Sequence, residues 1–198
     1  MAVVTMYANQ SAKISISYPT TNYSDDVVVD DGNLLVSFSG FPLAAQFKKI
    51  ILAKIFLYAT LSGSTAQNIS GSVISFLAES FVEKSVTYQT RPKTSLNRAK
   101  IYAYVSSAKY VSADVSGIYL AGVPEILQHG IQADPPYGVG FQTSRGSNKP
   151  YVTVEYSDDL VGLALSSLSP DSGSIVAANA TVFSWTEKVD GVCYAGVS

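Results

Sequence analysis

The sequence predicts an all-β protein, built from many short strands as a sandwich or a barrel. Hydrophobic residues recur at every second position along much of the chain, which is the period of half-buried strands. Turn-forming sequences such as Asp31-Gly32 and Arg91-Pro92 separate these segments at short intervals. The composition, 47% hydrophobic and 14% charged, provides enough apolar side chains for a core that needs no disulfide.

The strands are expected where the alternation is clearest. In the segment 12–18, Ile14, Ile16 and Tyr18 would share one face. The run 50–58 is apolar at nearly every position, which is typical of a strand covered on both faces. The remaining strands are predicted at 34–38, 71–77, 100–105, 137–142 and 151–156.

One stretch departs from the period of two. Asp114 can cap a helix, Pro124 suits a first helical turn, and Gly130 can end one in the left-handed conformation. We therefore expect one or two short helical turns between Ser116 and His129, closing an end of the sandwich.

The composition changes after Tyr156, where a polar segment is followed by a new apolar one and by a predicted strand at 181–185. Roughly forty residues with two or three strands cannot bury a core alone. The sequence therefore predicts a β-sandwich over 1–158 and, over 159–198, either the first strands of a truncated second β domain, which we favour, or an extension docked on the first.

Several motifs follow one another in a fixed order within the first 158 residues. They are Asn22–Asp25, Leu34–Phe38, Ile50–Tyr58, Glu79–Pro92, Asp114–Ser116 and Pro150–Tyr156. Together they resemble the DNRLRE-type domain, with Phe81 where that family usually has Trp and Phe38-Ser39 in place of its F-D.

The resemblance implies a jelly-roll β-sandwich related to certain carbohydrate-binding modules. Residues 159–198 resemble the start of an immunoglobulin-like or fibronectin type III-like domain.

Catalytic groups are scarce in the sequence. His129 and Cys193 are the only histidine and cysteine, so one chain cannot build a Cys/His zinc site. Glu79 and Glu83, if they shared one strand face, would stand about 13 Å apart. Glycosidases hold their two carboxylates closer than that. We therefore expect a protein that is not an enzyme.

The charge distribution argues against two classes of partner. The net charge is −2 and the basic residues are scattered, so the basic footprint of a nucleic-acid-binding protein is missing. No apolar segment reaches the length needed for membrane insertion, and the N-terminus lacks the pattern of a signal peptide.

Aspartates gather in one short segment, which suggests a possible metal site. Oxygen-rich loops of this kind can hold Ca²⁺, the one cofactor that the sequence leaves open. Asp-Gly is also common hairpin chemistry, and charges protect strand edges, an interpretation that we prefer. The weak Ca²⁺ candidates are Asp25, Asp26, Asp30 and Asp31, with Asn33 beside them.

Aromatic and arginine side chains are the remaining candidates for ligand binding. Tyr102 and Tyr104 share a strand face, Tyr137 is expected on a loop, and Arg91 and Arg98 bracket another loop. Rings of this kind stack on sugars, and planar polar groups bind their hydroxyls. A buried ring with a hydrated hydroxyl would explain most of the thirteen tyrosines equally well.

Two functions fit these observations. The first is a non-catalytic module that binds a polysaccharide or cell-surface glycan, within a larger extracellular or phage tail or fibre protein. The alternative is a purely structural module that contacts other subunits of a virion or surface fibre without binding glycans. Both imply an extracellular or virion location.

Overall fold

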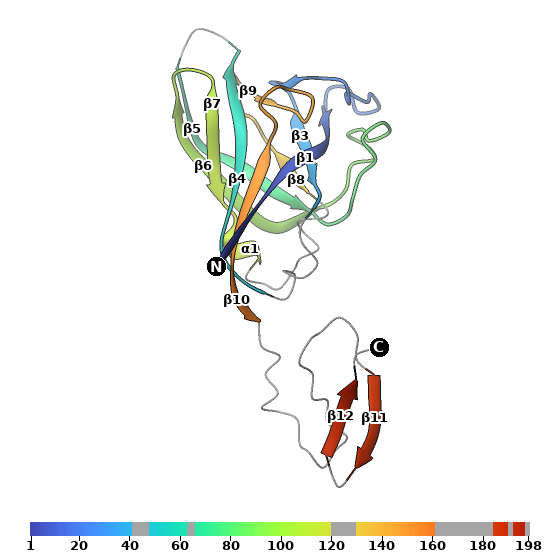
Figure 1. Cartoon of the computed structure of the whole chain (residues 1–198). Coiled ribbons are helices and arrows are strands. Elements are labelled where there is room, and N and C mark those ends of the chain that lie inside the picture. The colour runs from blue at the N-terminus through green and yellow to red at the C-terminus, as the bar shows by residue number, and fades with distance from the viewer. Residues whose placement is uncertain (41–47, 63–65, 120–129, 161–183, 190–191, 197–198) are drawn as a thin grey trace.

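The computed structural model describes residues 1–40, 48–62, 66–119, 130–160, 184–189 and 192–196, and it confirms the all-β prediction (Figure 1). Every strand pair is antiparallel. The elements are β1 (Ala2–Ile14), β2 (Val28–Val29), β3 (Asn33–Phe38), β4 (Lys48–Leu61), β5 (Gln67–Leu77), β6 (Thr94–Val105), β7 (Lys109–Asp114), α1 (Ser116–Tyr119), β8 (Ile131–Ala133), β9 (Val139–Gln142), β10 (Tyr151–Leu160), β11 (Ser184–Val189) and β12 (Val192–Gly196).

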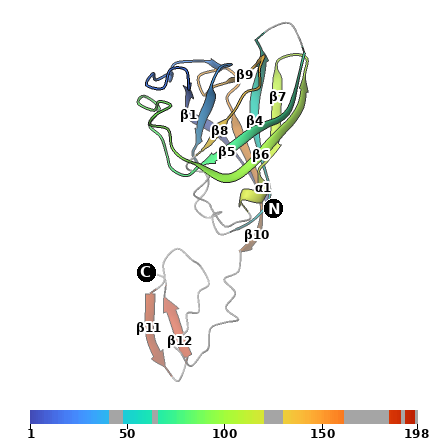
Figure 2. The same ribbon diagram turned by 180° about the vertical axis from the view of Figure 1, so that it is seen from behind.

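Strands β1 to β10 form one continuous sheet that folds into two layers, a β-sandwich-like arrangement. The front layer, toward the viewer in Figure 1, contains β7, β4, β10 and the first half of β1, with β9 and β2 beside β4. The rear layer runs from the second half of β1 through β3, β8 and β5 to β6, and it faces the viewer in Figure 2.

Strand β1 belongs to both layers. Its residues from Ala2 to Tyr7 pair with β10, and those from Ala8 to Ile14 pair with β3. The register shifts between Ala8 and Gln10, the signature of a β-bulge. A bulge bends a strand and increases its twist, so β1 can turn the corner from one layer to the other.

The core lies between the layers and draws on both. On β4 the residues Ala53, Ile55, Leu57 and Ala59 are buried at alternate positions. They pack with rear-layer side chains such as Ile74 in one cluster. Burying a side chain of this size stabilises the fold by about 1.5–3 kcal/mol, so the period-two pattern alone accounts for which face of each strand points inward.

A second, smaller cluster lies outside the rear layer. The segment from residue 78 to residue 93 crosses the outer surface of β1 and β3, and it packs Phe81 and Val86 against Ile14 and Leu35. Asn22 fixes this covering loop, because its Nδ2 donates to the backbone oxygens of Glu83 and Val86 at 2.9 and 2.7 Å. The covering loop also reaches Leu77 at the end of β5, whereas Tyr102 and Tyr104 on β6 remain exposed.

The expected strand at 12–18 is wrong at its C-terminal end. Strand β1 ends at Ile14, and the side chains of Ile16 and Tyr18 are 70% and 59% exposed. The chain turns here, since the backbone N–H of Tyr18 donates to Ser15 O at 3.3 Å. Pro19 follows and disfavours a continued regular ladder, so the alternation continues in sequence but not in structure.

Strand β4 differs from the prediction that the run 50–58 is covered on both faces. Its outward residues Phe56 and Tyr58 are only half-buried, so only one face of the strand lies in the core. Four further strands, β2, β7, β8 and β12, were not expected at all. Residues 79–83 form no strand, so the strand spacing considered for Glu79 and Glu83 does not apply.

The helix begins at Ser116 as expected, and Asp114 Oδ1 accepts a hydrogen bond from the Ser116 N–H at 2.8 Å. The rest of the predicted helical stretch, 120–129, lies outside the described residues. Among the described residues, no helix is long and apolar enough to cross a membrane.

Strand β10 continues to Leu160, two residues past the predicted boundary at 158. Near the C-terminus, β11 and β12 pair as a hairpin that contains Trp185, while residues 181–183 of the expected strand are not described.

Candidate binding surface

The outer face of the rear layer brings together most of the residues predicted to bind a ligand. Strand β6 alternates, with Ala99, Ile101 and Val105 pointing into the core. The intervening side chains point outward, and Tyr102 and Tyr104 are 70% and 61% exposed. We call this outward row the β6 face, and its residues are Arg98, Lys100, Tyr102 and Tyr104.

Arg98 is placed differently from the prediction. It does not bracket a loop, because β6 begins at Thr94 and Arg98 lies within the strand. Arg98 pairs with Ser75 of β5, and Ser75 pairs with Gln132 of β8. Gln132 therefore lies on the same outer surface as Arg98, with the buried Ser75 between them.

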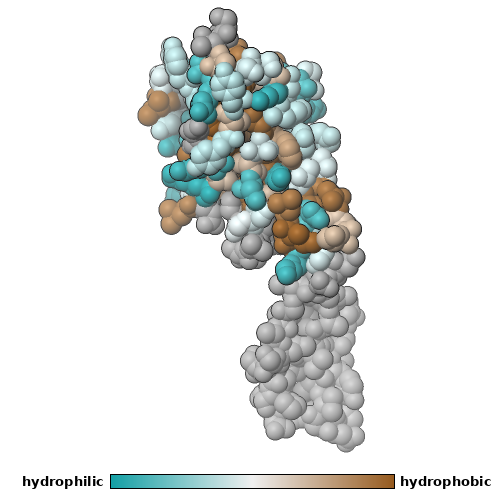
Figure 3. Space-filling model, turned by 90° about the vertical axis from the view of Figure 1, so that its left-hand side faces the viewer, coloured by the Kyte–Doolittle hydropathy of each residue, from teal (hydrophilic) through white to brown (hydrophobic). Residues whose placement is uncertain are grey.

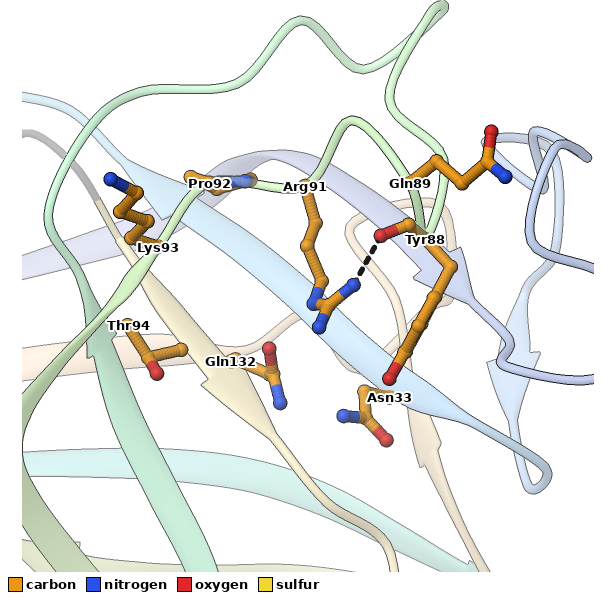
Figure 4. Close-up of a pocket in the computed structure, with 8 residues that line it drawn as sticks. All are labelled: Asn33, Tyr88, Gln89, Arg91, Pro92, Lys93, Thr94 and Gln132. Carbon is orange, nitrogen blue, oxygen red and sulfur yellow. Dashed lines mark hydrogen bonds between the residues drawn. The ribbon is translucent and has the colours of Figure 1, made fainter.

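A pocket of about 580 Å³ adjoins the β6 face where the covering loop ends (Figure 4). Asn33 of β3 and Gln132 of β8 point into it from the sheet, and the loop provides the opposite wall. The complete lining is Asn33, Tyr88, Gln89, Arg91, Pro92, Lys93, Thr94 and Gln132.

Arg91 is held in a defined position within this pocket. The centre of its guanidinium group lies 3.7 Å from the centroid of the Tyr88 ring, a cation–π contact. Its Nη1 also donates to the backbone oxygen of Tyr88. Thr87 and Thr90 shape the turn, since the Thr87 N–H donates to Thr90 Oγ1 at 2.9 Å. The turn thereby aims the guanidinium toward the rear layer.

Tyr137 lies in a turn between β8 and β9, as expected for this residue, and its side chain is 97% exposed. The strand predicted at 137–142 is wrong at its start, because β9 begins only at Val139. The next residue, Gly138, has a φ of 81° and lies against the side chain of Gln67. Gln67 pairs with Val105, the neighbour of Tyr104. The turn therefore lies near the end of the β6 face that is remote from Arg91.

The four aspartates proposed as weak Ca²⁺ ligands are not gathered around one point. Asp25 lies 2.8 Å from Lys84 Nζ and 3.6 Å from Arg145 Nη2, while Asp26 lies 3.8 Å from Lys13 Nζ. A hydrogen bond and the charge of Lys84 lower the pKa of Asp25. Across the described part of the chain, no three His, Cys, Asp or Glu side chains are grouped to hold a metal ion.

Glu83 takes part in a network that joins three loops. Its Oε1 accepts from the Ser11 N–H at 3.0 Å, and its Oε2 accepts from Arg145 Nη2 at 3.2 Å. Arg145 Nε donates in turn to Ser24 O. Both oxygens of the Glu83 carboxylate thus make contacts that stabilise the fold. These contacts anchor the covering loop beside β1.

The front layer carries an aromatic cluster that the sequence analysis missed. Tyr151 lies at its centre, with ring centroids 4.5 Å from Phe56, 5.2 Å from Tyr110 and 5.6 Å from Tyr7. Tyr58 extends the cluster, 5.0 Å from Tyr110. We call these five rings the aromatic ladder, because they come from directly paired positions on β1, β10, β4 and β7.

Two tyrosines of the aromatic ladder, Tyr110 and Tyr151, have a raised pKa. Burial raises the pKa of Tyr110, and the neighbouring tyrosines add to the shift. Burial likewise raises the pKa of Tyr151, and Tyr7 contributes. Tyr110 also donates its hydroxyl proton to the Lys149 backbone oxygen at 3.2 Å. The alternation of Phe56 and Tyr58 on β4 was a visible signal of an outward aromatic row.

Hydrophobic surface also collects at one end of the two-layered body, as Figure 3 shows in brown. The N-terminus lies at this end in Figure 1. Met1 and Val3 are 82% and 66% exposed. Elsewhere in that view, over β5, β6 and β7, the surface is mostly teal and pale, because polar residues and tyrosines cover it.

Comparison with known proteins yields no identification: no protein-family model matches the chain, and no curated protein is significantly similar to it.

Proposed function

We propose that this chain is a non-catalytic module that binds a carbohydrate on the β6 face and in the adjoining pocket. The observation that carries the proposal is the joint exposure of Arg98, Tyr102 and Tyr104 on one strand, beside a pocket that contains Arg91. The resemblance to DNRLRE-type domains, and with it a jelly-roll sandwich, supports the same reading.

The chemistry of this surface suits a sugar ligand. Exposed tyrosine rings offer flat faces to the apolar C–H patches of a sugar, at a small cost in side-chain entropy. The amides of Asn33 and Gln132 can donate and accept, so they can bind hydroxyl groups in the pocket. The combination of rings beside amides is what separates a sugar-binding surface from a general hydrophobic patch.

A structural role is the second candidate. The exposed Met1 and Val3, and the outward Tyr7 of the aromatic ladder, could contact another subunit of an extracellular or virion assembly. Val3 and Tyr7 lie on β1, which begins directly after Met1, and the outward side chains at this end of the strand belong to the front layer. The two functions therefore use different surfaces and can be separated by mutation.

A glycan array tests the first function directly. The full chain is compared with the double variant Arg98→Ala, Tyr102→Ala and with Tyr7→Ala, which alters the front layer. We expect glycan signals for the wild type and for Tyr7→Ala, and a loss of about 100-fold in the double variant, since each removed contact is worth about 1–2 kcal/mol. An array without any signal, or equal signals from all three proteins, contradicts the proposal.

A further inference from the structure

We infer that the ligand of the β6 face is an acidic polysaccharide, one whose sugars carry carboxylate groups. The inference rests on the proposed function. Arg98 and Lys100 point outward from β6, and Arg91 and Lys93 line the adjoining pocket. The whole chain has 13 basic and 15 acidic residues, so four cations on one surface are a local excess of positive charge within a slightly acidic protein.

Among the described residues, the ion pairs that hold the loops together use other basic residues. In the part of the chain that the structure describes, the ion pairs of Lys13, Lys84 and Arg145 lie at the covering loop and the N-terminal turns. Arg98 and Lys100 form no such pair with a described residue. Both are exposed, so their charges are available to a ligand.

Two carboxylates lie near the face and do not cancel the excess. Asp134 is level with Lys100 across β5, because its N–H donates to Val73 O and Val73 pairs with Lys100. Asp134 Oδ1 already accepts from Gln132 Nε2 at 3.1 Å. Glu79 follows Ala78, whose N–H donates to Lys93 O at the edge of the pocket. The four cations of the face and the pocket outnumber these two carboxylates.

Arg91 supplies the most specific contact for an acidic sugar. Stacking on Tyr88 and the hydrogen bond from Nη1 hold its guanidinium in one orientation, so little side-chain entropy remains to be lost on binding. The remaining N–H groups face the pocket interior beside Gln132 (Figure 4). A guanidinium matches a carboxylate in shape and charge, and such bonds are about twice as strong as neutral ones.

The arrangement along β6 fits an extended polymer. The row from Arg98 to Tyr104 extends over six residue-to-residue steps, or about 20 Å at ~3.3 Å per step. The cations occupy the end near the pocket, and Tyr102 and Tyr104 occupy the other end. A chain of sugars lying along β6 would place carboxylates on the cations and ring faces on the tyrosines at the same time.

Calorimetric titration of the full chain tests the inference. The probes are polygalacturonate, hyaluronan and alginate, each beside its carboxyl-reduced form, which keeps the backbone and removes the charge. We expect at least one acidic polymer to bind ten-fold or more tightly than its reduced form, and to bind more weakly in ~0.5 M salt, where charges are screened. Equal affinity within all three pairs overturns the inference.

Two lysine variants test whether binding of the acidic polymer depends on the β6 face. Lys100→Gln is expected to lower the affinity for the acidic polymer about ten-fold, because one charge-assisted contact is lost. Lys149→Gln removes another exposed lysine, next to the front layer, and is expected to leave the affinity unchanged. An equal loss in both variants would indicate unspecific attraction and contradict the inference. If the glycan array detects only neutral glycans, the inference fails and the proposed function stands. If neither the glycan array nor the calorimetric titration detects binding, both the inference and the proposed function are rejected.

Discussion

The rings of Phe56 and Tyr151 stack face to face across β4 and β10, with centroids 4.5 Å apart and planes 9° from parallel. The two residues are directly paired in the ladder of hydrogen bonds. Cross-strand aromatic pairs stabilise a sheet beyond their buried area. Tyr151 also contacts Tyr7 and Tyr110, so it joins β1 and β7 to the centre of the front layer.

Tyr151→Ala should therefore destabilise the protein by about 2 kcal/mol, since three ring contacts are lost on a half-buried site. Tyr151→Phe keeps the ring and should cost less than ~0.5 kcal/mol. Urea denaturation measures both. The matched control is Tyr102→Ala on the β6 face, which should leave the free energy of unfolding nearly unchanged. Equal stability of the two alanine variants would show that the aromatic ladder does not support the fold.

The raised pKa of Tyr110 in the aromatic ladder leads us to expect that the protein loses stability at alkaline pH. The pKa of Tyr110 is raised above its ordinary value of 10.0, so the folded state keeps a proton that the unfolded state releases. The stabilisation is complete below pH 10 and is lost as the pH rises through the folded-state pKa. Unfolding followed by tyrosinate absorbance should show this decline, and Tyr110→Phe should reduce it. A variant with the wild-type alkaline profile contradicts the assignment.

The network at Glu83 predicts a large effect of a single carboxylate. Glu83→Ala leaves the Ser11 N–H and the Arg145 guanidinium without their partner, and it should destabilise the protein by about 2–3 kcal/mol. Glu83→Gln keeps an acceptor for Ser11 and should cost less. Thermal unfolding measures both, with the exposed Glu79→Ala as the control. A neutral Glu83→Ala would mean that the covering loop is held by its apolar contacts alone.

Gly130 approaches β3 more closely than any side chain would allow. Its φ is 99°, and a Cβ there would lie 2.0 Å from Val36 O. Gly130→Ala should cost about 3 kcal/mol, from the left-handed backbone and from the clash together. Gly40 has a similar φ of 94° but open space around it, so Gly40→Ala should cost only about 1 kcal/mol. Equal denaturation midpoints for the two variants would contradict the close packing.

The alternation of residues in the sequence correctly predicted which side chains of a strand point inward and which point outward. Tyr102 and Tyr104 lie outward on one strand because alternation follows from the pleat itself. Leu34, Val36 and Phe38 are buried for the same reason. The same pattern failed at Ile16 and Tyr18, where a turn interrupts the strand and hydrophobic alternation carries no structural meaning.

The aromatic ladder and the pocket could not be predicted in this way. Tyr7 and Tyr151 meet because β1 and β10 pair in one particular register, although the two residues lie at opposite ends of the sheet-forming sequence. Register between distant strands is a property of the whole fold. Likewise, Arg91 and Gln132 share a pocket only because the covering loop ends beside β8.

We propose that the rear layer binds the ligand and that the front layer supports the fold. Amide chemical-shift mapping by NMR distinguishes the two layers, with the oligosaccharide that gives the strongest signal on the glycan array as the probe. We predict shifts at β5, β6, β8 and residues 88–94, with the amides of Tyr7, Phe56 and Tyr110 unchanged. Shifts confined to β1, β4, β7 and β10 would contradict the claim and assign binding to the aromatic ladder.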